Sequence, residues 1–97
     1  MIVIEKYELS KPFEFEGQTY YEVELNFDAI TGEVVEAVQE QFREIYEIKK
    51  ANLVPEFDKR YQRLIAQIAT GLPETFFKQL YGTDYSAIMA MVLNFLT

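Results

Sequence analysis

The chain has 97 residues, the size of one domain, and 49% of them are hydrophobic, which favours a packed core over disorder. The absence of cysteine and histidine excludes disulfides, thiol chemistry, Ser-His-Asp and Cys-His catalysis, and Cys/His zinc sites. The net charge of −7 is segregated, because residues 1–47 carry a balance of −9 and residues 48–97 a balance of +2. Nucleic-acid-binding proteins normally have a basic face. We therefore expect no nucleic-acid partner, and we predict no cofactor or metal. An enzyme of this composition would have to work with carboxylates, Lys, Tyr or Ser alone.

The first segment alternates between apolar and acidic residues up to Phe27, with a turn marked by Gly17. This period of two predicts an antiparallel β-hairpin over residues 1–27. A two-residue loop would place Phe13 and Phe15 on the same face as the glutamates of the second strand. We therefore predict a three-residue loop with Gly17 at positive φ, because a one-residue slip would turn each side chain to the other face. The predicted inner face then holds Phe13, Phe15, Thr19, Tyr21, Val23 and Leu25.

From residue 31 to the end, the period becomes helical. Thr31 is the expected N-cap of a first helix, whose apolar stripe is Val34, Val38, Phe42, Ile45 and Ile48. A second helix is expected to begin near Pro55 and end before Gly71, with Phe57, Tyr61, Leu64, Ile65 and Ile68 along one side. A short helix should follow from Pro73 to about Tyr81. Thr83 is the expected cap of a last helix, Asp84 to Leu96.

These elements predict an α+β fold: a small N-terminal antiparallel hairpin followed by a bundle of about four helices. Residues 1–97 are expected to form a single domain, with the hairpin in 1–27 and the helical region in 31–97. The start of the chain has an acidic residue at position 5 and no basic run before it, which argues against a secretory signal. The last apolar run is about half of the ~20 residues that cross a bilayer, so no membrane association is expected.

The last helix is unusually apolar, with large side chains over about 200° of its circumference, twice the stripe that a surface helix needs. One flank could pack on the domain itself and the other would then need a cover, either a second copy of the chain or a partner's amphipathic helix. The alternative is that this helix lies at the centre of the core. The candidate partner-binding residues are Tyr85, Ile88, Met89, Met91, Val92, Leu93, Phe95 and Leu96.

Two charged groups also invite interpretation. Glu36, Glu40, Glu44 and Glu47 run along one side of the first helix, either as a solvated face or as a rail for a basic partner or a divalent ion. The basic residues Lys49, Lys50, Lys59, Arg60 and Arg63 gather around one connection between helices, where a solvated corner is the simpler interpretation.

Two segments resemble one known family. The first is LSKPFEFEGQTYYEVELN, and the second is the spacing Leu80-x3-Asp84-x3-Ile88-x3-Val92-x2-Phe95-Leu96. Together they cover about a third of the chain, and the order of the other elements agrees. The chain thereby resembles the tail assembly chaperones of long-tailed bacteriophages, of the tail-protein-E type. The middle, from Glu36 to Leu72, carries no motif specific to that family.

The resemblance implies a protein that is not an enzyme and that binds the tape measure protein, keeping this long helical chain soluble during tail morphogenesis. It implies a place in the host bacterial cytoplasm and absence from the mature virion. Self-association along a long client is a further expectation. The alternative from the charge pattern is a small acidic phage-encoded inhibitor that mimics the charge of nucleic acid.

Overall fold

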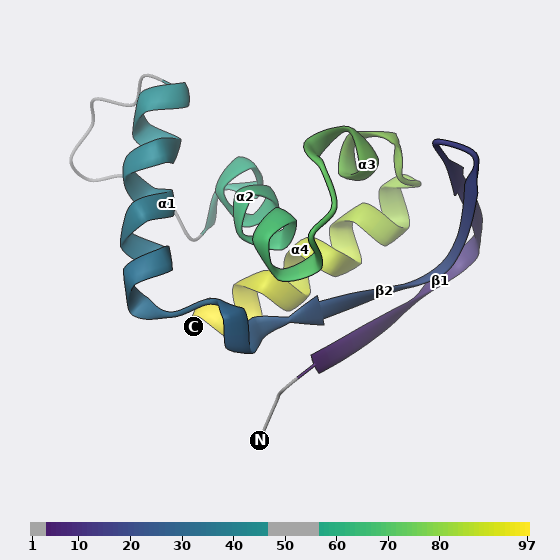
Figure 1. The fold of residues 1–97 in the computed structure, drawn as a ribbon, viewed down its shortest axis with the longest axis horizontal. Coiled ribbons are helices and arrows are strands. Elements are labelled where there is room, and N and C mark those ends of the chain that lie inside the picture. Colours follow the sequence, from purple (N-terminus) through teal and green to yellow (C-terminus); the bar gives the residue numbers. More distant parts are fainter. Residues whose placement is uncertain (1–3, 47–56) are drawn as a thin grey trace.

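The fold is an α+β arrangement, in which a curved β-hairpin packs beneath a layer of helices (Figure 1). The computed structural model describes residues 4–46 and 57–97. Strands β1 (Ile4–Phe15) and β2 (Gln18–Asn26) form a two-stranded antiparallel sheet, and the short 3-10 helix η1 (Phe27–Ala29) follows. The helices are α1 (Gly32–Ile45), α2 (Lys59–Thr70), α3 (Glu74–Gln79) and α4 (Gly82–Leu96). The predicted fold class is therefore confirmed.

The hairpin turn differs from the prediction. Phe15 pairs with Gln18, so the loop has two residues, Glu16 and Gly17, both at positive φ (50° and 77°). Positive φ at both loop positions belongs to the type I′ turn, which matches the right-handed twist of the flanking strands. Gly17 was correctly expected at positive φ, whereas the three-residue loop was wrong.

The loop was predicted to change which side chains face inward, but this change occurs within the strands instead. The pairing register shifts between Glu8 and Phe13, where four residues of β1 lie opposite a single residue of β2, Tyr21. Tyr20 consequently points inward together with Phe13, and Tyr21 is 66% exposed. The placement of Thr19 and Tyr21 on the inner face was therefore wrong, since both are exposed.

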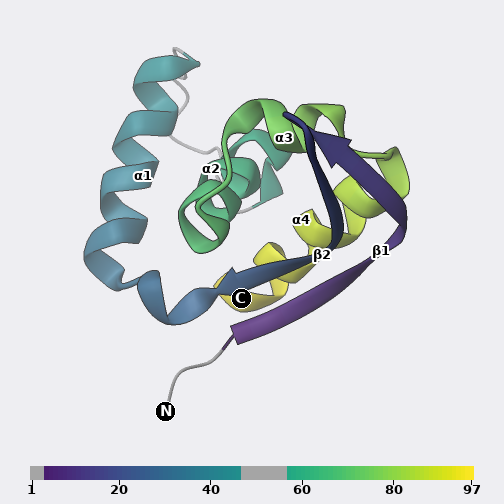
Figure 2. The same ribbon diagram turned by 45° about the vertical axis from the view of Figure 1, so that its right-hand side comes forward.

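The tip of the hairpin is held by α3. The ring of Phe76 lies 5.3 Å from Phe13, 5.3 Å from Phe15 and 5.0 Å from Tyr20, centroid to centroid, and each contact is edge-on. Such edge-to-face pairs add roughly 0.5–1.5 kcal/mol beyond burial of their surface. Figure 2 shows the hairpin bending up toward α3 at this end, with α1 at the opposite end of the molecule.

The helix boundaries agree with the sequence in most places. The Thr31 hydroxyl accepts from the backbone N–H of Val34 (3.3 Å) and caps α1, and Gly71 ends α2 in the left-handed conformation (φ 74°). The start of α2 differs, since Asp58 is its N-cap and Phe57 is 66% exposed outside the helix. Ile45 and Ile68 are also exposed, at 51% and 43%. The predicted positions of Ile48 and Pro55 lie outside the described residues.

The core lies between the hairpin and the helices, with α2 at its centre. Tyr61, Ile65 and Ala66 of α2 have no exposed surface, and α2 packs against α1, β2, α3 and α4. The hairpin contributes Leu9, Phe13, Phe15, Val23 and Leu25, and α1 contributes Val38 and Phe42. The described elements therefore share one hydrophobic core.

Candidate functional site

The N-terminus of α4 is tied to β1 by a buried carboxylate. Asp84 has no exposed surface, and its two oxygens accept from the Tyr7 hydroxyl (2.8 Å), the Ser10 backbone N–H (3.0 Å) and the Ser10 hydroxyl (3.0 Å). Hydrogen bonding to this carboxylate raises the pKa of Tyr7 above its ordinary value. The expected cap at Thr83 was wrong: helix α4 begins two residues earlier, with Tyr81 in the N-cap position, and Tyr81 makes no side-chain capping bond.

The middle of α4 belongs to the core. Ile88, Met89 and Val92 have no exposed surface in the chain and pack among the other core residues. In this conformation these three side chains are unavailable to a partner. The substitution of Met89 would therefore remove core packing, and it cannot serve as a test of partner binding.

The remaining candidate residues lie beside the buried strip or at the ends of α4. At about 100° per residue, Met91 and Phe95 lie on one side of the strip formed by Ile88, Met89 and Val92, whereas Tyr85 has the same angle as the strip and lies at the N-terminal end of the helix. Leu93 and Leu96 are half-buried. Two separate cavities lie against α4, one near each end: Tyr85 lines the N-terminal one, and Met91 and Phe95 line the C-terminal one. The wide apolar arc therefore has a buried centre and a partly open region near each end, and the assignment of these open regions to a partner stays a prediction.

The first cavity, here called the C-terminal cavity, has a volume of about 320 Å³ and lies between α4, η1 and β1. Its wall contains the stacked rings of Phe27 and Phe95, with centroids 4.5 Å apart and planes inclined by 9°. Phe95 keeps 40% of its surface exposed, and Met91 beside it is half-buried. The remaining lining residues are Glu5, Asp28 and Asn94. An apolar hollow with an acidic rim fits an apolar side chain that has basic neighbours.

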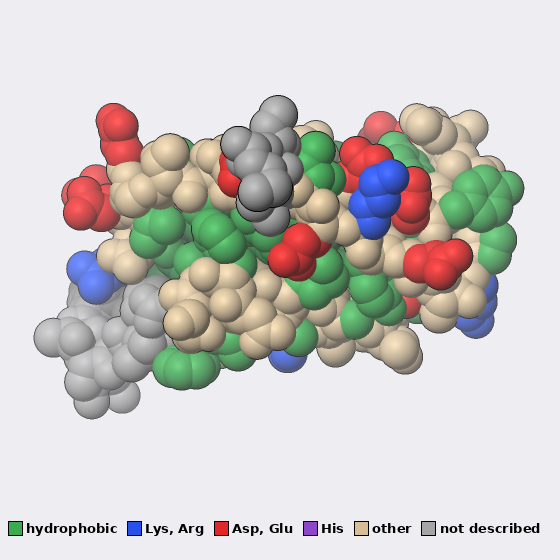
Figure 3. Space-filling model, turned by 90° about the horizontal axis from the view of Figure 1, so that it is seen from below, with side chains coloured by type: hydrophobic (Ala, Val, Ile, Leu, Met, Phe, Trp, Pro, Cys, Tyr) green, Lys and Arg blue, Asp and Glu red, His purple; other side chains and the backbone are tan. Residues whose placement is uncertain are grey.

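The surface around this end of the molecule has the same character. Figure 3 views the molecule from the hairpin side, and hydrophobic side chains gather there toward the α1 end, with mainly acidic side chains around them. The isolated exposed side chains elsewhere, such as Tyr21, are ordinary for a small domain.

The second cavity, here called the corner cavity, has a volume of about 290 Å³ and lies where α2, α3 and the start of α4 meet. Its lining residues are Arg63, Phe77, Lys78, Leu80, Gly82 and Tyr85. Two of these are cations, and one of them, Arg63, is only 8% exposed. The sequence pointed to Tyr85 as a partner-binding residue and to Arg63 only as part of a basic cluster, because the two residues come from different helices.

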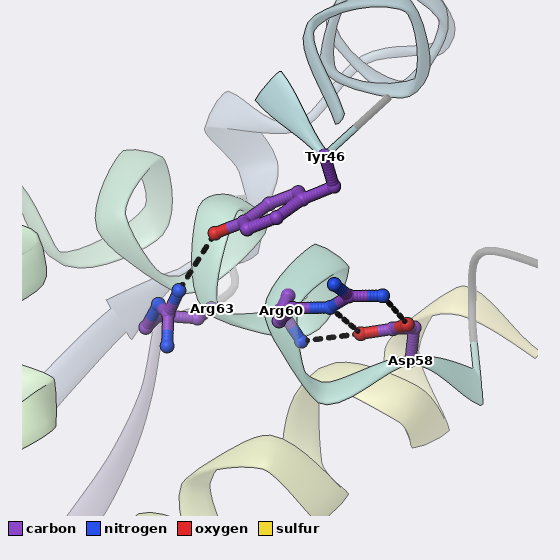
Figure 4. A network of polar contacts seen from close by, with 4 residues as sticks. All are labelled: Tyr46, Asp58, Arg60 and Arg63. Atoms are coloured by element: carbon purple, nitrogen blue, oxygen red, sulfur yellow. Dashed lines mark hydrogen bonds and ion pairs between the residues drawn. The ribbon is translucent and has the colours of Figure 1, made fainter. Parts of the chain in front are cut away.

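The basic cluster at the α1–α2 connection is used largely within the domain (Figure 4). Arg60 pairs with both carboxylate oxygens of Asp58 (3.0 and 2.7 Å) and lies 4.5 Å above the ring of Tyr46. The Arg60 guanidinium lowers the pKa of Asp58 below its ordinary value, chiefly by hydrogen bonding. Arg63 donates to the Tyr46 hydroxyl (2.8 Å). Lys49 and Lys50 lie outside the described residues.

The acidic side chains form solvent-facing surfaces. Glu8 and Glu22 are paired directly opposite each other on the outer face of the hairpin, and Glu36, Glu40 and Glu44 are exposed on α1. Glu47 lies outside the described residues. Within residues 4–46 and 57–97, no three carboxylates come together in a way that could hold a metal ion.

Comparison of the chain with protein-family models, with curated proteins and with solved structures finds no match. No helix in the described part of the chain is long and apolar enough to cross a membrane.

Proposed function

We propose that this chain is a phage tail assembly chaperone, and that its C-terminal cavity receives a helical segment of the tape measure protein. The proposed function involves no catalytic step and no cofactor. The observation that carries it is the C-terminal cavity itself: a hollow with the Phe27–Phe95 stack in its wall and Glu5 and Asp28 at its rim. The chain would act in the host bacterial cytoplasm and leave the tail before the virion is complete.

The two segments that resemble the family are in direct contact, which supports the proposal. Ser10, from the first segment, donates twice to Asp84 of the second. Leu80, Asp84, Ile88 and Val92, which make up most of the second pattern, are all buried. The shared spacing therefore has a physical cause in packing, because these positions join α4 to the hairpin and the core. This contact is what a common fold would require.

The chemistry of the C-terminal cavity suits an amphipathic helical client. A partner helix binds in a groove through apolar side chains spaced along one of its own faces. Phe95 and Met91 can receive such an anchor, and the adjacent carboxylates favour Lys or Arg beside it. The remaining exposed acids, together with the net charge of −7, would keep a protein with this apolar surface dispersed.

The test is co-expression of the chain with the tape measure protein from the same genome, followed by measurement of the soluble and co-purified fractions of the client. We expect the client to be soluble and to elute with the chain. Phe95→Ser and Met91→Ser should each weaken the complex about tenfold or more, because burial of one large apolar side chain contributes roughly 1.5–3 kcal/mol.

Tyr21→Ser is the matched control, since it removes an exposed aromatic ring from the outer face of the hairpin, away from the cavity. Each variant is first compared with the parent by thermal unfolding, so that loss of the complex is separated from loss of the fold. A client that precipitates with the parent chain present, or that binds the Phe95→Ser variant as tightly as the parent, would overturn the proposal.

The acidic hairpin supports one second candidate, a charge mimic that binds a basic host protein. Like charges directly opposite each other on a sheet are destabilising, and Glu8 and Glu22 are in that position. A basic partner would relieve this repulsion. Binding of such a partner should weaken steeply with salt and should be insensitive to Phe95→Ser, whereas the chaperone complex should show the opposite pattern.

A further inference from the structure

The corner cavity contains a buried cation with too few partners. Arg63 is 8% exposed, and its Nη2 donates to the Tyr46 hydroxyl (2.8 Å). A carboxylate oxygen of Glu74 is 3.8 Å from Nη2, beyond hydrogen-bond distance. Within the described residues, Nε has no hydrogen-bond partner. A buried guanidinium is normally paired with a carboxylate, often through two parallel bonds.

Glu74 is held by a different cation. Its carboxylate accepts from Lys78 at 2.8 Å, one turn along α3, and this bond is the main reason that its pKa lies below the ordinary value. Arg63, Lys78 and Glu74 together carry one net positive charge at the cavity, in a chain whose total is −7. The site is therefore locally complementary to a single negative charge.

The start of α4 adds to this preference. Gly82 lines the cavity, and α4 begins there without a side-chain cap. The first backbone N–H groups of a helix have no intrahelical partner, and they favour anions. Asp84, the acid in the same turn, is hydrogen-bonded to Tyr7 and Ser10 on β1. The other walls of the cavity, Phe77, Leu80 and Tyr85, are apolar or aromatic.

We propose that the corner cavity binds a carboxylate carried on a small apolar body. The carboxylate would accept from Arg63 and Lys78, and the apolar body would lie against Phe77, Leu80 and Tyr85. Two sources share this chemistry: a free organic acid, or a glutamate or aspartate beside an apolar residue in a partner protein. The site is separate from the C-terminal cavity and does not depend on the proposed chaperone function.

The first experiment titrates the full chain with 3-phenylpropionate and with its neutral analogue 3-phenylpropanol, following backbone amide shifts by NMR. We expect the acid to bind in the millimolar range, about tenfold more tightly than the alcohol, because charge-assisted hydrogen bonds contribute more than neutral ones. The largest shifts should be at Gly82 and Tyr85. Equal affinity for acid and alcohol, no binding of the acid, or shifts confined to another face would each overturn the proposal.

Lys78, which is exposed, and Glu74, which is half-buried, give variants with opposite expected effects. Lys78→Gln removes a cation from the cavity and should weaken binding of the acid, whereas Glu74→Gln removes a competing carboxylate and should tighten it, each by about fivefold for one charge at about 4 Å in a highly solvated site. Glu36→Gln on α1 makes the same change of charge away from the cavity and should leave binding unaltered. A Glu74→Gln variant that binds the acid more weakly than the parent would contradict the assignment.

A second titration separates the two sources. It uses a blocked pentapeptide with a central Glu-Phe pair, and the same peptide with Gln in place of Glu. Tighter binding of the Glu peptide than of 3-phenylpropionate identifies a protein segment as the ligand, and tighter binding of the free acid identifies a small organic acid. If the Gln peptide binds as well as the Glu peptide and the free acid does not bind, the carboxylate site does not exist.

Discussion

The bond network around Asp84 leads to the sharpest stability prediction. Replacing Asp84 with Ala removes the acceptor of three hydrogen bonds, from the Tyr7 hydroxyl and from the N–H and hydroxyl of Ser10. Each hydrogen bond to a charged group contributes roughly 1.5–3 kcal/mol, but relief from burying the charge offsets part of the sum. Ser10 is exposed and regains water after the substitution. We expect a net loss of about 3 kcal/mol, a large share of the ~5–15 kcal/mol typical of a domain.

Two further variants show whether the effect comes from the bonds. Asp84→Asn keeps one acceptor oxygen, so it should lose about half as much stability as Asp84→Ala. Ser10→Ala removes only the hydroxyl and should lose about 1 kcal/mol. In a double-mutant cycle, Asp84→Ala and Ser10→Ala should show a coupling of about 1 kcal/mol, since they remove one shared bond.

The assay is urea unfolding followed by far-ultraviolet circular dichroism, because the chain has no tryptophan to report by fluorescence. The free energies of unfolding are compared at pH 7, with the slope against urea checked for each variant. An Asp84→Ala variant as stable as the parent, or more stable, would refute the reasoning. The buried carboxylate would then be a net desolvation cost that its three bonds fail to offset.

Three other substitutions test local features. Because the pKa of Tyr7 is raised in the folded state, the stability that this residue contributes is complete below pH 10 and is lost as the pH rises through the folded-state pKa. The melting temperature of Tyr7→Phe should therefore fall less steeply above pH 10 than that of the parent, as measured by thermal unfolding. Glu16→Asn should stabilise the hairpin by about 0.5 kcal/mol, since Asn tolerates the positive φ of the type I′ turn; a lower melting temperature would contradict this. Tyr46→Phe removes the hydroxyl that accepts from Arg63 and should cost about 1 kcal/mol in urea unfolding, while an unchanged midpoint would mean that water replaces it.

The class of fold could be predicted from the sequence because the two periods are clear. The alternation around Val23 and Leu25 and the helical spacing of Val38 and Phe42 are properties of local segments, and the structure buries all four residues. Caps such as Thr31, and the left-handed Gly71, are also local, since each concerns one turn of chain. Features of this range need no knowledge of the rest of the fold.

The register of the hairpin could not be predicted, because its cause lies at the other end of the chain. The N–H of Ser10 donates to Asp84, and Pro12 has no N–H, so this part of β1 cannot complete a regular ladder with β2. The sequence-based prediction assigned the change of side-chain face to the turn. The two-residue type I′ turn keeps Phe15 opposite Gln18, so no change of face occurs there.

The candidate site was only partly predictable for a related reason. The apolar arc of the last helix pointed to Met91 and Phe95, which do line a cavity, but also to Ile88, Met89 and Val92, which are in the core. Helical spacing gives the angle of a side chain around its own axis and says nothing of the neighbours that cover it. Phe27 and Arg63, which complete the two cavities, come from other elements.

The bond between Ser10 and Asp84 also bears on the order in which the chain can fold. These residues are 74 positions apart, and closing a flexible loop of that length costs about 4 kcal/mol by the logarithmic rule, beyond a constant term. The cost must be met before the contact stabilises anything, which places this step late and makes it slow relative to closure of the hairpin turn. A chain emerging from the ribosome with β1 and β2 but without α4 has the turn and lacks the acceptor for Ser10. Its strands can therefore pair in other registers until α4 is synthesised and Asp84 accepts the hydrogen bond from Ser10, which fixes the register.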